Sequence, residues 1–357
     1  MIVPVPRKSL LDRFELLVAR AVMKLSHETL VRLSGTPPVV VDGQTLHPEI
    51  QFALAARKRR GVPPLRAATA ELARAAMLAE SRRYAREPLP LVTRDLTIAA
   101  PHGHVLDARF YETPEPGGPQ PLLVFFHGGG FCLGDIETHD EPCRLLCARA
   151  GVHVLSVAYR LAPEHPFPAA TEDGEAAFTW ALAHAGELGA DPARVGVGGD
   201  SAGGNIAAVV SHLGRTTGRT PAFQFLVYPV MDRASPWPSF DLFAKGFLLE
   251  RADVDFFDGC YTGTNRELAS DVRVSPLRAD APPAVPTVVV TAAFDPLRDE
   301  GEAYAAWLEK HGMPVVARRF AGMIHGFIHM APVSRAADAA VSELASLLRQ
   351  LSRTPRS

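Results

Sequence analysis

The sequence RVGVGGDSAGG, residues 194–204, joins a short apolar run to the helical pattern NIAAVVSHL. This order indicates a strand that turns sharply into a helix, with Ser201 at the turn. The turn is so tight that side chains at Gly199 and Gly203 would collide with the neighbouring strand and helix. Ser201 is thereby held at a helix N-terminus, where backbone N–H groups favour developing negative charge. We interpret it as a nucleophile; an idle serine in a glycine-rich turn is the alternative.

Apolar runs alternate with helical patterns on both sides of this turn. The segments LVTRDLTIAA and HVLDARFYE read as a hairpin-like pair, and six continuous runs are typical of strands covered on both faces: PLLVFF, GVHVLSVAY, RVGVGG, FQFLVYP, PTVVVTAA and PVVARRF. Helical patterns lie between them at about 140–150, 170–187, 202–214, 299–312 and 335–351. The recurring β-α-β unit predicts an α/β fold with a mostly parallel sheet of about eight strands.

Two regions depart from this alternation. Residues 1–90 read as helical, with helices expected at about 46–60 and 70–85 and an N-terminal helix that carries one apolar stripe, Leu10, Phe14, Leu17, Ala21 and Leu25. We favour packing of that stripe on the protein itself over docking on lipid. Residues 232–280 contain mixed aromatics and no strand run, which predicts an insertion over one sheet edge.

Composition excludes several classes of protein. With 37 basic against 39 acidic residues the net charge is −2, whereas nucleic-acid binders usually carry a strongly basic face. No window approaches the roughly 18 apolar residues of a membrane-spanning helix. Charges at Asp12, Arg13, Glu15 and Arg20 interrupt the apolar core that a secretory signal needs, so we expect a cytoplasmic protein.

A second glycine cluster follows an apolar strand in PLLVFFHGGGFCLGD, residues 121–135. Without a Cβ, the backbones of Gly128, Gly129 and Gly130 can turn their N–H groups toward a ligand. Such donors stabilise the oxyanion of an acyl-transfer intermediate, each by about 3–4 kcal/mol. A plain flexible loop is the alternative. We assign the preceding His127 to holding this loop.

A serine hydroxyl needs a base and an orienting carboxylate, which this fold places C-terminal to the nucleophile. Of the downstream histidines, His212 points away along the helix that Ser201 opens, His311 closes a helix, and His329 is interpreted as structural. His325 follows the strand PVVARRF at the sheet end where α/β proteins place their sites. Asp295 follows PTVVVTAA in the same way, with a helix N-cap as its alternative role.

The chain at this point resembles a known family. Five segments are similar to those of hormone-sensitive-lipase-type (family IV) bacterial esterases of the GDSAG-motif subgroup: HGGGF (127–131), YRLAPEHPFPAA (159–170), GDSAGG (199–204), DPLRDEG (295–301) and HGF (325–327). The resemblance covers about residues 90–350 and keeps the family's motif order. It implies an α/β-hydrolase fold with helices on both faces of the sheet.

The resemblance also implies roles for individual residues. Ser201, Asp295 and His325 would form the catalytic triad, and an oxyanion hole would use the backbone N–H groups of Gly128, Gly129 and Ala202. A helical cap built from residues 1–90 and 232–280 would cover a catalytic domain spanning 91–357, and homodimers are plausible by resemblance. The N-terminal region is some forty residues longer than is usual for the family.

These observations predict a serine carboxylesterase acting on small-molecule esters of short to medium acyl length. Four aromatic side chains are candidates for the substrate pocket: Phe131, Trp237, Phe247 and Phe327.

The same triad could cleave an amide, a formamide or a lactone, and a non-catalytic receptor is a second alternative. The scheme requires no metal or organic cofactor; Cys143 and Cys147 lack a second ligand pair at zinc spacing and are expected to be buried free thiols.

Overall fold

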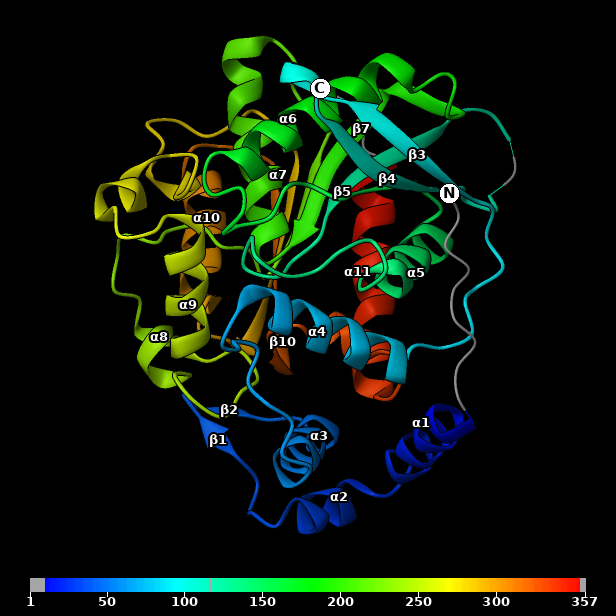
Figure 1. The fold of residues 1–357 in the computed structure, drawn as a ribbon, viewed down its shortest axis with the longest axis vertical. Helices are drawn as coiled ribbons and strands as arrows, with labels where there is room; N and C mark the ends of the chain where they lie inside the picture. Colours follow the sequence, from blue (N-terminus) through cyan, green and yellow to red (C-terminus); the bar gives the residue numbers. More distant parts are fainter. Residues whose placement is uncertain (1–9, 116, 354–357) are drawn as a thin grey trace.

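An eight-stranded sheet forms the centre of the molecule in the computed structural model, which describes residues 10–115 and 117–353 (Figure 1). The strand order is β10-β9-β8-β7-β5-β6-β4-β3. The strands are β3 Thr93–Ala99, β4 Val105–Tyr111, β5 Gln120–Phe126, β6 His153–Val157, β7 Ala190–Asp200, β8 Gln224–Val227, β9 Thr287–Phe294 and β10 Val315–Ile324. Among the described strands of this sheet, only the pairings of β4 with β3 and with β6 are antiparallel, so the predicted α/β fold with a mostly parallel sheet is confirmed.

Helices cover both faces of this sheet because its strands are apolar on both sides. In β5, Leu122, Val124 and Phe126 face one core, while Leu123 and Phe125 face the other. The first core is closed by α6 Ala169–His184, α7 Ala202–Thr217 and α10 Arg298–Lys310, and the second by α5 Asp140–Ala150 and α11 Arg335–Arg353. Two short 3-10 turns, η1 Pro101–Gly103 and η4 Phe327–Met330, follow β3 and β10.

The N-terminal elements lie beyond one end of the sheet, with α4 between the sheet and the first three helices (Figure 1). They are α1 Leu10–Val22, α2 His27–Ser34, the hairpin of β1 Val40–Val41 and β2 Gln44–Thr45, α3 Pro48–Arg59 and α4 Ala70–Tyr84. The expected helices over 46–60 and 70–85 correspond to α3 and α4. Helix α2, capped by Ser26, and the small hairpin were not anticipated.

The apolar stripe expected on α1 is largely exposed and is not packed into the core of the protein. Phe14 and Leu17 are each 64% exposed, whereas Leu16 and Met23 are buried. The buried positions are Leu16 in α1 and Met23 directly after it, so the prediction for the stripe is corrected. The Leu10 side chain and residues 1–9 lie outside the described part. No helix among the described residues has the length and apolar character needed to span a bilayer.

The segment 232–280, all of which is described, contains helices and no strand. Its elements are α8 Pro238–Leu242, α9 Arg251–Tyr261 and the 3-10 turns η2 Arg266–Ser270 and η3 Pro276–Arg278. It is tied to the N-terminal region because Asp253 Oδ1 accepts hydrogen bonds from the backbone N–H and the guanidinium of Arg66. The division into a cap of 1–90 and 232–280 and a catalytic domain of 91–357 stays a prediction.

The strand-to-helix turn after β7 is packed against the end of β5. A Cβ on Gly203 would stand 1.9 Å from the carbonyl oxygen of Phe126, and one on Gly199 would stand 2.3 Å from the same oxygen. Both separations are far inside van der Waals contact and both partners are backbone. The two glycines are therefore required for β7, α7 and β5 to meet.

We predict that Gly203→Ala lowers the free energy of unfolding by about 2–3 kcal/mol, because the new methyl group forces two backbones apart. Urea denaturation followed by circular dichroism measures this. The control is Gly259→Ala in α9, where nothing lies within 4 Å of the added Cβ and the helix propensity improves. Equal stability of Gly203→Ala and the wild type would contradict the steric argument.

Candidate active site

Three predicted site residues follow the carboxyl ends of strands in the same sheet. Ser201 follows β7, Asp295 follows β9 and His325 follows β10. Since β7, β8, β9 and β10 are parallel neighbours, their carboxyl ends lie along one edge of the sheet. The topology thus brings together side chains that are 124 and 30 positions apart in the chain.

The three side chains form a hydrogen-bonded line. Ser201 Oγ lies 2.9 Å from His325 Nε2, and His325 Nδ1 lies 2.7 Å from Asp295 Oδ2. The carboxylate can only accept, so His325 carries its proton on Nδ1 and presents the Nε2 lone pair to the serine. Asp295 is fully buried, while Ser201 and His325 keep 8% and 7% exposure. The nucleophile and base are thus almost fully enclosed.

Asp295 orients the imidazole and also fixes the turn before α10; the N-cap of that helix is Leu297, so the alternative role of Asp295 as N-cap is wrong. Its Oδ1 accepts the backbone N–H of Leu297 at 2.8 Å, just before α10 begins, and its Oδ2 accepts from His325. The carboxylate is therefore fixed by one oxygen and orients the imidazole with the other. This division holds the ring in the tautomer described above.

Ser201 sits in a strained backbone conformation, with φ 54° and ψ −117°. Such positive φ values are uncommon for residues with a side chain and persist where surrounding contacts enforce them. Here the Ser201 N–H donates to the Val227 carbonyl, and the Ser201 carbonyl accepts from Asn205 and Val230. These bonds tie the turn to β8 and to the first turn of α7.

The glycine loop after β5 differs from the expectation at one donor. The Gly128 N–H donates a hydrogen bond to Asp200 Oδ1 at 2.8 Å. Asp200 directly precedes the nucleophile, so this N–H points to Asp200 and is not available to a substrate oxygen. A side chain at position 128 would also meet Asp200, with a Cβ 2.5 Å from Oδ2. Gly128 is therefore a structural contact rather than an oxyanion donor in this arrangement, which corrects the prediction for that residue.

Other N–H groups of the loop and the turn are available. Within the described chain, no hydrogen bond uses the N–H of Gly129 or Gly130. Ala202 is the first residue of α7, where an N–H has no intrahelical acceptor. Gly129 and Gly130 have φ of 123° and 60°, which allows the loop to turn at these positions. Gly130 is a donor that the sequence interpretation missed, although it belongs to the same glycine run.

His127 lies behind this loop. It is buried and stacked on Tyr159 at 4.3 Å between ring centroids, and the Tyr159 hydroxyl donates to the His127 carbonyl. Burial lowers the pKa of His127 to about 4, so the ring is neutral at physiological pH. These contacts agree with its assignment to holding the loop.

None of the other downstream histidines, all of them described, forms a hydrogen bond with Ser201 Oγ. His212 contacts the Tyr304 hydroxyl at 3.3 Å, and burial lowers the pKa of His212 to about 4. His311 caps the end of α10. His329 lies in η4 beside His139, and burial lowers the pKa of His329 to about 3.

The four predicted pocket aromatics differ in their surroundings. Phe327 is fully buried and packs against Tyr228 and Phe320, so it belongs to the core and the prediction that it lines a pocket is wrong. Phe131 is stacked on Tyr261 with ring centroids 3.8 Å apart. Trp237 and Phe247 are half-buried, and substrate contact by these two and by Phe131 stays a prediction.

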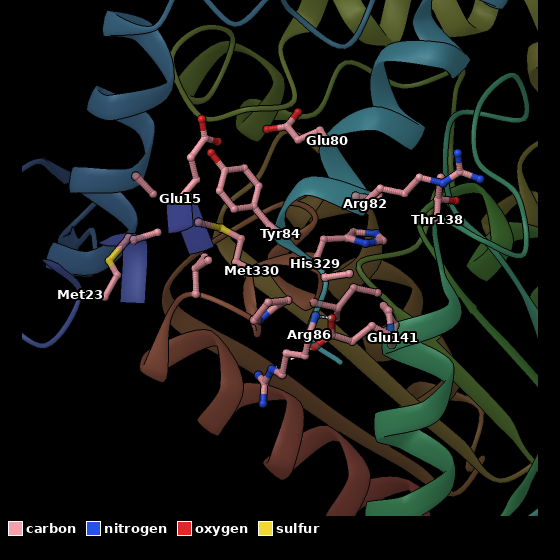
Figure 2. A pocket seen from close by; sticks show the side chains of 18 of the residues that line it. Glu15, Met23, Glu80, Arg82, Tyr84, Arg86, Thr138, Glu141, His329 and Met330 are labelled. Carbon is pink, nitrogen blue, oxygen red and sulfur yellow. Dashed lines mark hydrogen bonds and ion pairs between the residues drawn. The ribbon is translucent and has the colours of Figure 1, made fainter. Parts of the chain in front are cut away.

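A cavity of about 1200 Å³ lies between α1, α3, α4, α5 and η4 (Figure 2). None of the four aromatics and none of the triad residues lines it. Among the residues that line the cavity, Ile324 is the one next to a triad residue in the chain, since it directly precedes His325. Apolar side chains from distant segments line it, among them Phe14, Val18, Leu248, Ile324 and Ile328. Helix α1 therefore supplies one wall of this cavity.

Arg74 on α4 connects the N-terminal region to the glycine loop. Its guanidinium donates to the carbonyl oxygens of Cys132 and Ala162, at 2.7 Å each, and forms an ion pair with Glu164. The sequence analysis did not identify this residue, because an arginine in an ordinary helical pattern carries no signal of a distant loop contact. The contact holds the loop that follows β5 against α4.

Comparison with known proteins agrees with this architecture. A protein family described as having the alpha/beta hydrolase fold matches residues 123–329. The carboxylic ester hydrolase LipN of Mycobacterium tuberculosis is 44% identical over 325 residues, which cover 89% of this chain and 86% of LipN. The ethyl acetate hydrolase of Pseudomonas putida is 33% identical over 307 residues, covering 84% of this chain and 96% of that protein.

Solved structures give the same result. The carboxylesterase EstE1, cloned from a metagenomic library, superposes with a TM-score of 0.75 at 41% identity, covering 80% of this chain and 99% of EstE1. A thermostable esterase from Pseudomonas putida ECU1011 superposes with a TM-score of 0.80 at 34% identity, covering 85% and 97% of the two chains. The fold class is thus that of the α/β hydrolases. The chain belongs to this family, and its resemblance to the hormone-sensitive-lipase-type esterases is confirmed; the GDSAG subgroup stays a prediction.

Glu300, in the first turn of α10, is a buried carboxyl group that follows Asp295 in the chain. Its Oε1 accepts the Met231 N–H at 2.7 Å, and Arg233 Nη1 lies 3.7 Å from its Oε2. Burial raises the pKa of Glu300 to about 8 from the usual 4.5, although Arg233 opposes the shift. The folded chain therefore keeps a proton that the unfolded chain releases between these two pH values.

We predict that Glu300→Gln makes stability less dependent on pH. The contribution of Glu300 is fully present below pH 4.5 and is lost as the pH rises toward 8. Because glutamine does not ionise, the fall of the unfolding free energy with pH should become shallower by up to about 1 kcal/mol per pH unit. Denaturation series across this range measure the slope, with the exposed Glu309→Gln as control. An unchanged slope in Glu300→Gln would refute the assignment.

Proposed function

We propose that this protein is a serine carboxylesterase that uses Ser201 as nucleophile, His325 as general base and Asp295 as the orienting carboxylate. The observation that carries the proposal is the hydrogen-bonded line from Ser201 Oγ through both ring nitrogens of His325 to Asp295. Relatives named as ester hydrolases support the class of reaction. The substrate is a small-molecule carboxylic ester.

In the first half of the reaction, Ser201 Oγ attacks the ester carbonyl carbon while His325 Nε2 accepts the hydroxyl proton. Asp295 stabilises the imidazolium that forms. The tetrahedral intermediate collapses as the C–O bond to the alcohol breaks, and His325 returns the proton to the leaving oxygen. An acyl-enzyme on Ser201 remains. Water then attacks it with His325 again as base, which releases the acid and restores the serine.

The negative charge on the former carbonyl oxygen needs preorganised donors. We propose the N–H groups of Gly129 and Ala202, with Gly130 as a third, because these groups have no other acceptor among the described residues and flank Ser201. Gly128 contributes indirectly: its bond to Asp200 fixes the start of the loop. Each donor is worth about 3–4 kcal/mol of transition-state stabilisation.

Ser201→Ala and His325→Ala should each reduce hydrolysis of p-nitrophenyl butyrate by at least about a thousandfold, and Asp295→Asn by a similar order, because each removes one member of a unit that acts together. Initial rates under saturating substrate measure this. The rates in Ser270→Ala and His311→Ala should equal that of the wild type, since both side chains are exposed and distant in sequence from the turn. Activity surviving in Ser201→Ala or His325→Ala excludes that residue from the mechanism.

We propose a preference for short to medium acyl chains, because Ser201 and His325 are almost fully enclosed and the large apolar cavity contains neither of them. Rates across p-nitrophenyl esters from acetate to palmitate should therefore be highest for butyrate to octanoate and fall steeply for longer chains. A maximum at palmitate would instead indicate that the acyl chain enters the cavity walled by α1.

Location in the cytoplasm and homodimerisation stay predictions from the sequence.

A further inference from the structure

A second polar cluster lies behind the nucleophile and takes no part in the proposed reaction. His139 at the start of α5, Asp200 at the end of β7 and His329 in η4 each offer one ligand atom, and the three atoms lie within 4.8 Å of one another. The rings of His139 and His329 meet edge to face, with centroids 4.6 Å apart. Three distant segments thus converge on one point.

The protonation of His139 can be deduced from its neighbour Thr138. The Thr138 hydroxyl accepts the Asp135 N–H and donates its only proton to the Asp135 carbonyl, at 2.8 Å each. With the hydroxyl proton on that carbonyl, the 2.9 Å contact between Thr138 Oγ1 and His139 Nδ1 is donated by the ring. In the neutral ring this leaves a lone pair on Nε2.

Nε2 has no hydrogen-bond partner among the described residues, although His139 is completely buried. Nε2 instead lies 3.2 Å from Asp200 Oδ1. A nitrogen lone pair and a carboxylate oxygen repel each other at this separation, and a buried polar atom left unpaired is costly. A cation bound to both atoms removes both penalties.

The spacing of the cluster suits a tetrahedral metal ion. Zinc bonds to imidazole nitrogen and carboxylate oxygen are about 2.0–2.2 Å, so neighbouring ligands of a tetrahedral site stand roughly 3.3 Å apart. His139 Nε2 and Asp200 Oδ1 already have this separation. Asp200 Oδ1 also accepts the Gly128 N–H, but a carboxylate oxygen has a second lone pair for a metal. His329 needs only a small movement to complete three ligands.

Access to the cluster is provided by the large cavity. His329 and Thr138 are among the side chains that line it (Figure 2). An ion can therefore reach the cluster from the cavity without passing Ser201, and the fourth position of the metal would face that space. Two imidazoles and one carboxylate with an open position form a donor set typical of zinc and similar borderline divalent ions.

We propose that His139, Asp200 and His329 form a binding site for a divalent cation of the zinc class, separate from the triad. The inference is independent of the role of Ser201. Bound metal would share the Asp200 oxygen that holds the Gly128 N–H, immediately before the nucleophile. Occupancy should therefore loosen the glycine loop and reduce ester hydrolysis, which makes the site inhibitory rather than a cofactor site.

The test is a Zn²⁺ titration of the full-length, metal-stripped protein in competition with a chromophoric chelator. The wild type should bind one ion per chain, and His329→Gln should bind it at least about tenfold more weakly. His139→Gln is the second variant and should show the same loss; circular dichroism checks the folding of both. With Co²⁺, the wild type should give the visible bands of a tetrahedral site without a sulfur charge-transfer band.

Two controls separate this site from other ligands for zinc. His325→Gln removes the imidazole of the triad, and Cys260→Ser removes the only cysteine that is not fully buried; both should bind zinc as the wild type does. The concentration of Zn²⁺ that halves ester hydrolysis should rise at least about tenfold in His329→Gln. Absence of binding at millimolar Zn²⁺, unchanged affinity in His329→Gln and His139→Gln, or loss of binding in His325→Gln would each overturn the proposal.

Discussion

The close contact between the turn at residues 199–203 and the end of β5 is the constraint on which the site depends. Gly203 and Gly199 leave no space for a Cβ beside the Phe126 carbonyl, so the nucleophile-bearing turn and the glycine loop meet backbone to backbone. The bond from the Gly128 N–H to Asp200 then links the loop to the turn directly. Ser201 and the loop donors share one rigid frame, and the ends of β9 and β10 carry Asp295 and His325 to the same edge.

Much of the architecture could be predicted from the pattern of apolar runs. Strands buried on both faces are continuously apolar, and all eight runs became strands of one sheet. The N-terminal region was less predictable because its elements are short and half exposed: α2 has only a few apolar positions, and the apolar stripe of α1 stays largely exposed. Periodicity identifies an apolar face of a helix, but it does not say what covers that face.

Individual site residues could be predicted where strand ends and glycine turns fix their position, as for Ser201, Asp295 and His325. The donors of the glycine loop could not be ranked from the sequence, because Gly128 and Gly129 are chemically identical and only the fold commits the first to Asp200. Phe327 was misassigned because its neighbour His325 is in the site, whereas its own side chain points into the core. Arg74 and His139 act across long sequence separations that leave no local motif.

The central claim is that Ser201 is a nucleophile activated by His325 and Asp295. Reaction with a fluorophosphonate, followed by intact mass measurement and peptide mapping, tests this most directly. We predict one adduct per chain, on the peptide that contains Ser201, and its loss in His325→Ala. An adduct on another serine, or no adduct in folded wild-type protein, would contradict the account.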